Sequence, residues 1–153
     1  MLPIRSILAP TDFSERSLPA LTAACELAEH FAASLIIVHV LTPLPATFPT
    51  DPAEIPINLS PYRNALLDEA RKALTALVEA QVPAGLDVTQ EVVWGPEAAS
   101  IVRLAEEREV DLIILCTRGA SGLSRFVSGS VTEKVVRLAE TPVLTIQADD
   151  DEQ

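Results

Sequence analysis

The segment CTRGASGLSRFVSGS, residues 116–130, places three of the chain's five glycines between two apolar stretches. Glycine adopts positive φ angles and lets a ligand approach backbone that a Cβ would block. Successive N–H groups in such a loop can surround an anion, and the N-terminus of a following helix adds unpaired donors. Serine hydroxyls and the guanidinium of Arg118 or Arg125 would add donors and positive charge. The segment therefore predicts a phosphate-binding loop, with a flexible connector as the alternative.

Other catalytic patterns are weak in this chain. The loop has neither the Gly-Lys-Ser/Thr of a P-loop nor the GxGxxG dinucleotide pattern, and it contains no hydrolase nucleophile elbow. His30 falls at the end of a predicted helix and His39 within a predicted strand, where we expect structural roles. No cluster of His, Cys, Asp and Glu has metal-ligand spacing. We therefore predict a binding protein with no metal site of its own, rather than an efficient enzyme.

Cys116 suggests a second kind of chemistry. A thiol at the end of a buried strand, next to a glycine loop, a helix N-terminus and Arg118, could have a lowered pKa and act as a redox sensor. The alternative is a small buried hydrophobic residue that ends the strand.

Hydrophobic periodicity predicts the elements that position these residues. Strands are expected over 4–10, 34–41, 86–94, 110–116 and 141–147, and helices over 18–32, 60–82, 95–109 and 130–140. This alternation predicts one α/β domain: an open five-stranded parallel sheet with helices on both faces, of the Rossmann-like kind. Segments 34–41 and 110–116 are almost wholly apolar and should be central, whereas 86–94 and 143–147 should lie nearer the edges.

Ligands of such sheets bind beyond the carboxyl ends of the strands. Asp12, in APTDFS, follows the first strand, and the glycine loop follows the fourth, so both would border one crevice if these strands are neighbours. Asp12 could equally act as a cap acceptor for the first helix. The last helix is expected to bury one face made of Val131, Val135, Leu138 and Ala139.

Composition limits the class of protein. The predicted domain covers residues 1–148, with a proline-rich loop over 42–61 and an acidic tail over 149–153. A net charge of -11 argues against a nucleic-acid partner, and the apolar runs are too short to span a membrane. The N-terminus does not resemble a secretory signal, and two cysteines are too few for a disulfide framework. We therefore expect a cytoplasmic protein.

Three segments, ILAPTDFSERSLPAL, IIVHV and DLIILCTRGASGLSRFVSGSVTEKVVRLAETPVLTI, together resemble the universal stress protein family. The resemblance covers nearly the whole chain and is weakest over 42–61. It implies an adenine nucleotide alpha hydrolase-like fold and a stress-response regulatory role. The nucleotide-binding branch has a motif of glycine, two residues, glycine, nine residues, then glycine and Ser or Thr. Gly119, Gly129 and Ser130 match it, and Cys116 stands in place of the first glycine.

The resemblance also implies a ligand and the residues around it. The ligand would be ATP, with AMP or ADP as alternatives and Mg²⁺ as a companion ion. Asp12 would meet the adenine and ribose side, Val40 would line the base pocket, and main-chain N–H groups of the loop would hold the phosphates. The full set of expected binding residues is Pro10, Thr11, Asp12, Val40, Cys116, Arg118, Gly119, Gly129, Ser130 and Val131.

The same resemblance implies a homodimer formed through the last strand, residues 143–147. Binding rather than turnover is expected, although slow ATP hydrolysis stays open, since Mg²⁺ with Asp12 could activate a water. Cys116 in place of the first glycine favours the other branch of the family, nucleotide-independent interaction proteins. The retained residues favour nucleotide binding.

Overall fold

The computed structural model describes residues 3–43, 60–117 and 131–147. Strands and helices alternate along these residues, as the periodicity predicts. A short 3₁₀ helix, η1, precedes the first α-helix. The elements are β1 (Ser6–Pro10), η1 (Glu15–Ser17), α1 (Leu18–Phe31), β2 (Ser34–Leu41), α2 (Ser60–Gln81), β3 (Val88–Trp94), α3 (Glu97–Glu107), β4 (Leu112–Thr117), α4 (Val131–Leu138) and β5 (Val143–Gln147).

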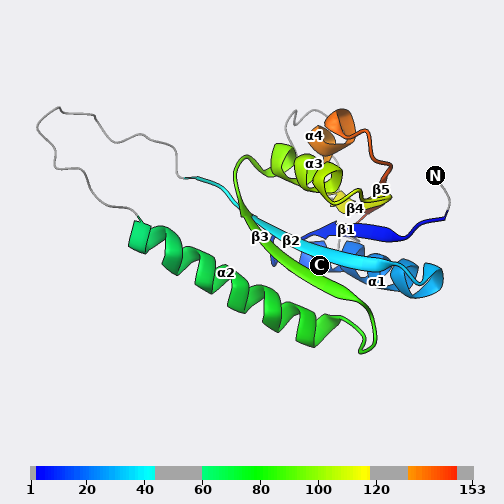
Figure 1. Ribbon diagram of the computed structural model, residues 1–153, viewed down its shortest axis with the longest axis horizontal. Coiled ribbons are helices and arrows are strands. Elements are labelled where there is room, and N and C mark those ends of the chain that lie inside the picture. Colours follow the sequence, from blue (N-terminus) through cyan, green and yellow to red (C-terminus); the bar gives the residue numbers. More distant parts are fainter. Residues whose placement is uncertain (1–2, 44–59, 118–130, 148–153) are drawn as a thin grey trace, which may run out of the picture.

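The strands form one parallel sheet of five strands in the order β3-β2-β1-β4-β5. The fold class predicted from the sequence is therefore confirmed. The two most apolar strands, β2 and β4, lie on either side of β1, and β3 and β5 form the edges (Figure 1). Strands covered on both faces need apolar side chains at every position, which explains why the inner strands lack polar alternation.

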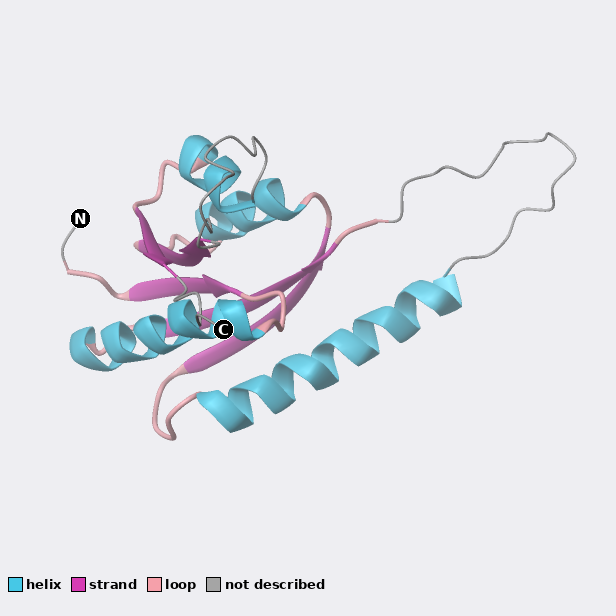
Figure 2. Ribbon diagram, turned by 180° about the vertical axis from the view of Figure 1, so that it is seen from behind, coloured by secondary structure: helices cyan, strands magenta, loops and turns pink. Residues whose placement is uncertain are grey.

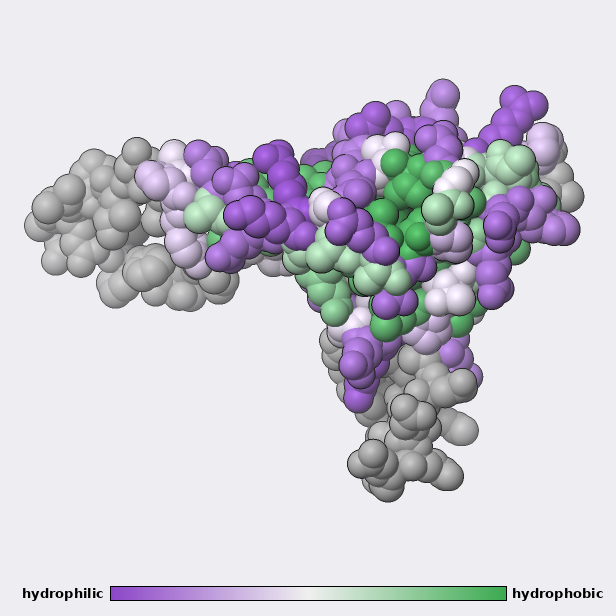
Figure 3. All heavy atoms as spheres, turned by 90° about the horizontal axis from the view of Figure 1, so that it is seen from below, coloured by the Kyte–Doolittle hydropathy of each residue, from purple (hydrophilic) through white to green (hydrophobic). Residues whose placement is uncertain are grey.

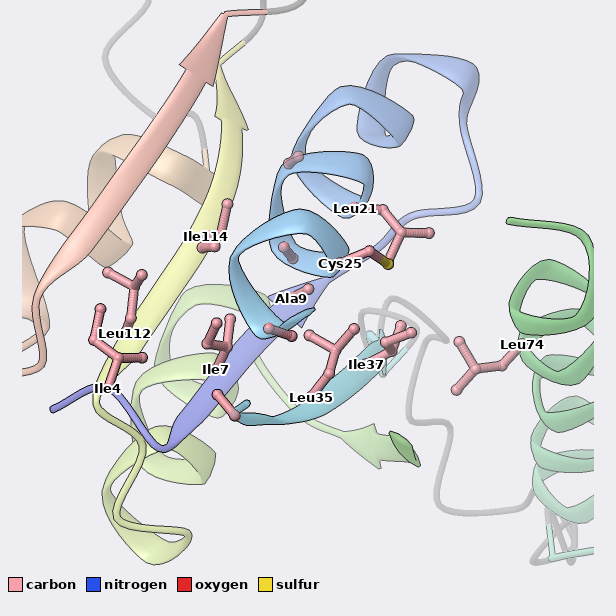
Figure 4. Packing of buried hydrophobic residues seen from close by; sticks show 14 residues of the cluster. Ile4, Ile7, Ala9, Leu21, Cys25, Leu35, Ile37, Leu74, Leu112 and Ile114 are labelled. Carbon is pink, nitrogen blue, oxygen red and sulfur yellow. The ribbon is translucent and has the colours of Figure 1, made fainter. Parts of the chain in front are cut away.

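Helices cover both faces of the sheet (Figure 2). Side chains alternate along each strand, so one set packs against α1 and α2 and the other against α3 and α4. Ile7, Leu35 and Ile114 belong to the first set (Figure 4). Leu8 and Ile113 belong to the second. All five are fully buried, so the core lies in two layers with β1 between them.

The helix boundaries follow local backbone rules. Pro19 lies in the first turn of α1, as expected for a residue without an N–H. Gly95 follows β3 with φ of 147°, and a Cβ there would lie too close to the Oγ of Ser100 in α3. Glycine at this position therefore allows the close approach of β3 to α3.

The predicted buried face of the last helix is wrong at one position. Val135 is fully buried, and Val131 and Ala139 pack against the same cluster, but the side chain of Leu138 is 55% exposed. At 3.6 residues per turn, Leu138 lies about 60° around the helix from Val135. Since Val135 marks the centre of the contact with the sheet and α3, Leu138 falls at its margin.

The surface viewed from below, where α1 and α2 lie, mixes both kinds of residue (Figure 3). Hydrophobic residues gather in the middle of this face, and hydrophilic residues surround them. Among the residues that the structure describes, no helix combines the length and the apolar character needed to cross a membrane.

Two leucine truncations test the core. Leu35→Ala should lower the free energy of unfolding by about 2–5 kcal/mol, because it leaves a cavity in a fully buried strand. Leu138→Ala removes the same atoms from an exposed site and should change it by about 0.5 kcal/mol or less. Urea unfolding of both variants measures the difference. Equal losses would contradict the assignment of Leu138 to the surface.

Candidate functional site

The neighbouring strands β1 and β4 separate at their carboxyl ends. β1 pairs with β4 at Ile7–Leu112 and Leu8–Ile113, and the pairing stops there. β1 continues along β2 as far as Pro10–Val38, and β4 continues along β5 as far as Thr117–Gln147. β1 and β4 are neighbours, as the proposed crevice requires, and the order of strands reverses between them. This is where ligands bind in open α/β sheets.

The turn after β1, Thr11–Ser14, is held by side chains that bond to nearby backbone. Thr11 is buried, and its N–H donates to the carbonyl of Val38 in β2 (2.9 Å). Its Oγ1 accepts a hydrogen bond from the N–H of Phe13 (3.1 Å) and lies 3.1 Å from the Oγ of Ser17. Phe13 has φ of 64°, in the left-handed region that residues other than glycine rarely adopt. The turn therefore has one defined backbone shape.

Asp12 is exposed at the tip of this turn, and its Oδ1 accepts hydrogen bonds from the N–H (3.0 Å) and the hydroxyl of Ser14. Partial burial raises the pKa of Asp12, but hydrogen bonds from Ser14 and Ser17 outweigh it and hold the pKa below its ordinary value. The carboxylate is therefore ionised at neutral pH. Neither η1 nor α1 has a side-chain cap hydrogen bond, so the expected capping role of Asp12 is wrong: its carboxylate closes a turn onto Ser14 instead.

His39 is joined to this turn, which sequence reasoning did not anticipate. Its Nδ1 lies 2.8 Å from the carbonyl oxygen of Thr11, and its ring stacks on Phe13 with centroids 4.2 Å apart. The ring of His30 meets Phe31 edge to face at 4.9 Å. Both contacts fit the structural roles expected of the two histidines. Only the pairing of β1 with β2 places His39 next to Thr11, so no local sequence signal could reveal the link.

The end of β4 and the start of α4 meet in space. The hydroxyl of Thr132, in the first turn of α4, donates to the carbonyl of Cys116 (2.7 Å). Val131 begins α4 and packs on the α3 side of the sheet. The N-terminal end of α4 therefore lies next to the end of β4. The other loop residues expected to bind are Arg118, Gly119, Gly129 and Ser130, and they lie outside the described residues.

The pKa of Cys116 shifts in the direction opposite to that expected of a redox sensor, although Arg118 and the glycine loop of that hypothesis lie outside the described residues. Its side chain packs at the margin of the α1-side cluster. Burial raises the pKa of the Cys116 thiol, and the nearby carboxylate of Asp12 raises it further, although the backbone amide of Ala20 opposes the rise. The expected lowering of the pKa is therefore wrong, because the strand end faces a carboxylate and an apolar layer. The alternative of a small hydrophobic residue fits better.

The remaining expected residues, Pro10 and Val40, lie at the carboxyl-terminal ends of β1 and β2. Pro10 ends β1 and is half-buried. Val40 lies two residues beyond Val38, the partner of Pro10, and is buried against α3. The structure thus brings Pro10, Thr11 and Asp12 together after β1, with Val40 on the adjacent strand.

A separate groove lies between α2 and the outer edge of β3, away from the expected site. Its arginines, Arg71 and Arg108, form ion pairs with Asp68 and Glu91. Sequence analysis singled out none of the groove's residues. The lining residues are Arg71, Leu74, Thr75, Thr89, Gln90, Glu91, Val92 and Arg108.

Comparison with known proteins agrees with the fold. The model of the universal stress protein family matches residues 3–147. Universal stress protein MJ0531 from Methanocaldococcus jannaschii is 34% identical over 143 residues, which cover 94% of this chain and 82% of that protein.

Solved structures agree as well. Protein MJ0577 from the same organism has a TM-score of 0.76 at 28% identity, covering 97% of this chain and 99% of that one. A universal stress protein solved in complex with cAMP has a TM-score of 0.60 at 27% identity, covering 95% of this chain and 98% of that one.

The ionisation of Asp12 gives a test of the site geometry. Its carboxyl should titrate below the ordinary value of 3.8 in the folded protein, because Ser14 stabilises the charged form. A folded pKa below the unfolded one stabilises the fold above the unfolded pKa, and this contribution is lost as the pH falls through the folded value. A ¹³C NMR titration of the Asp12 side chain measures this directly. In Ser14→Ala the midpoint should rise, and an unchanged midpoint would contradict the assigned hydrogen bonds.

Proposed function

Because the chain belongs to the universal stress protein family, we propose that it is an adenine-nucleotide-binding regulatory protein. Its ligand is ATP, with AMP and ADP as alternatives. The observation that carries the proposal is that the turn after β1 and the start of α4 both lie at the carboxyl ends of the neighbouring strands β1 and β4. An ionised carboxylate, Asp12, follows β1, and the N-terminal end of α4 lies beside the neighbouring strand, β4.

The chemistry of these two ends suits the two ends of a nucleotide. A carboxylate accepts hydrogen bonds from hydroxyl and amino groups and repels phosphate, so Asp12 belongs to the ribose and adenine side. Helix N-termini favour anions, so α4 belongs to the phosphate side. Gly119, Gly129 and Ser130 of the motif precede α4 in the sequence and would add main-chain donors there. Val40 offers an apolar side chain for the base.

A further observation supports the proposal. The solved universal stress protein with cAMP carries an adenine nucleotide on a chain 27% identical to this one. Mg²⁺, where it takes part, would neutralise part of the phosphate charge.

The protein acts by binding rather than by turnover. We assign structural roles to His30 and His39, whose described contacts are with Phe31 and with the turn after β1, and we assign neither a catalytic role. Bound nucleotide would change the conformation of the protein or the partner that it binds. We propose that it acts in the cytoplasm. The alternative is an interaction protein that needs no nucleotide, and Cys116 in place of the first motif glycine favours it.

Calorimetric titration with Mg-ATP separates the two functions. Wild-type protein should bind, and Gly129→Val should lose binding because a branched side chain would stand at a motif position that requires bare backbone. Gly122→Val is the matched control, since the motif treats residue 122 as a spacer, and it should bind like wild type. Binding that survives Gly129→Val unchanged would mean that the site is misplaced. Absence of binding to the wild type would favour the interaction protein.

We also propose a homodimer formed through β5. This strand is an edge, and Leu144 is 36% exposed on it. The carbonyl of Pro142 accepts from Ile113 in β4, so residues 142, 144 and 146 direct their backbone groups to β4. Val143 and Thr145 then direct theirs outward, where the same strand of a second copy could pair with them.

Thr145→Pro should yield a monomer. It removes an outward N–H and leaves the pairing of β5 with β4 intact, because proline is tolerated on the open side of an edge strand. Thr145→Val keeps the N–H and should remain dimeric. Sedimentation velocity at micromolar concentration measures both variants, with urea unfolding to show that they stay folded. A monomeric wild type, or a dimeric Thr145→Pro, would refute the β5 interface.

A further inference from the structure

We propose that His39 is a positioning residue for the nucleotide site: it holds the turn Thr11–Ser14 in the shape that presents Asp12. The inference rests on the proposed function and adds a residue to it. His39 lies in β2 and touches the turn through two separate contacts.

The first contact fixes Thr11 from both sides. Its N–H donates to the carbonyl of Val38, and its own carbonyl receives the Nδ1 of His39 at 2.8 Å. A carbonyl oxygen can only accept, so Nδ1 must carry the proton. Two consecutive residues of β2, Val38 and His39, therefore bind the N–H and the carbonyl of Thr11. The backbone pairing of β1 with β2 ends at Pro10, and the side chain of His39 adds one more link beyond it.

The second contact compensates for an unfavourable backbone. Phe13 has φ of 64°, which L-residues with bulky side chains rarely adopt. Such a conformation persists where surrounding contacts require it. The ring of His39 stacks on Phe13 at 4.2 Å, with planes 30° apart, and the hydroxyl of Thr11 accepts the N–H of Phe13. Phe13 is thus held by both its ring and its backbone.

The shape of the turn decides where the carboxylate of Asp12 lies. Its Oδ1 accepts from the N–H of Ser14, and the direction of that N–H depends on the backbone of Phe13, the residue between them, which here has φ of 64°. If Phe13 relaxes to an extended conformation, Ser14 moves away and Asp12 loses its fixed direction. The link from His39 to Asp12 therefore passes through Thr11 and Phe13 and requires no direct contact between the two.

Three substitutions separate the two contacts. His39→Asn keeps a donor at the position of Nδ1 and loses the ring, since its Nδ2 is the same number of bonds from the backbone. His39→Phe keeps a ring for Phe13 and loses the donor. His39→Leu loses both.

The affinity for Mg-ATP, measured by calorimetry, should fall by about tenfold in His39→Leu, as expected for the loss of a hydrogen bond and a ring contact. His39→Asn should keep most of the affinity that His39→Leu loses, and His39→Phe should keep less of it. Recovery by the donor variant is a result that a general loss of packing would not produce. Affinities within twofold of the wild type in all three variants would overturn the inference.

Two NMR measurements test the turn without any ligand. In the wild type, a long-range ¹H–¹⁵N spectrum should show neutral His39 as the tautomer with the proton on Nδ1, and the Nε2–H tautomer would overturn the inference even if every variant failed to fold. The three-bond HN–Hα coupling of Phe13 should report a positive φ in the wild type and lose this signature in His39→Leu. Retention of it would also overturn the inference. A wild type that shows both NMR signatures and binds no nucleotide would refute the proposed function and support His39 as the residue that holds the turn.

Discussion

The central constraint in this protein is the burial of β1 between two parallel neighbours and two helical layers. Ile7 and Leu8 are adjacent in sequence, point to opposite faces and are both fully buried. A strand in this position needs β2 and β4 at its sides and helices above and below it. The chain therefore passes from β1 to β2 and β3 on one side, and α3 then returns it to β4, on the other side of β1, before β5. This arrangement places the candidate site, because β1 and β4 separate at their carboxyl ends, at the point where the strand order of the sheet reverses.

Electrostatics explains how an acidic chain can bind an acidic ligand. With a net charge of -11, the protein cannot rely on long-range attraction for phosphate. The attraction has to be local, from backbone donors at a helix terminus, whose field acts over one turn. In the proposed mode of binding, Asp12 follows a different strand from the one that precedes α4, and its negative charge would orient hydroxyl and amino groups of the ligand.

The structure shows the surroundings of Cys116, which stands in place of the first glycine of the nucleotide-binding motif. The side chain packs at the margin of an apolar layer, and burial and the carboxylate of Asp12 raise the pKa of its thiol. Cysteine here behaves as a small hydrophobic residue, whose bulk is the relevant difference from glycine.

The sequence by itself determined the alternation of strands and helices, the central place of the most apolar strands, the edge positions of β3 and β5, and the motif around Gly119 and Gly129. These properties depend on periodicity and on spacing along the chain, which local physics controls. Only the tertiary structure decided that His39 bonds to Thr11, that Leu138 is exposed and that the pKa of Cys116 is raised. Each of these depends on which residues the strand register and the helix packing bring together across 20 or more positions of sequence, or on the exact centre of a helix contact. No local pattern encodes such neighbours, because they are set by the assembly of the whole sheet.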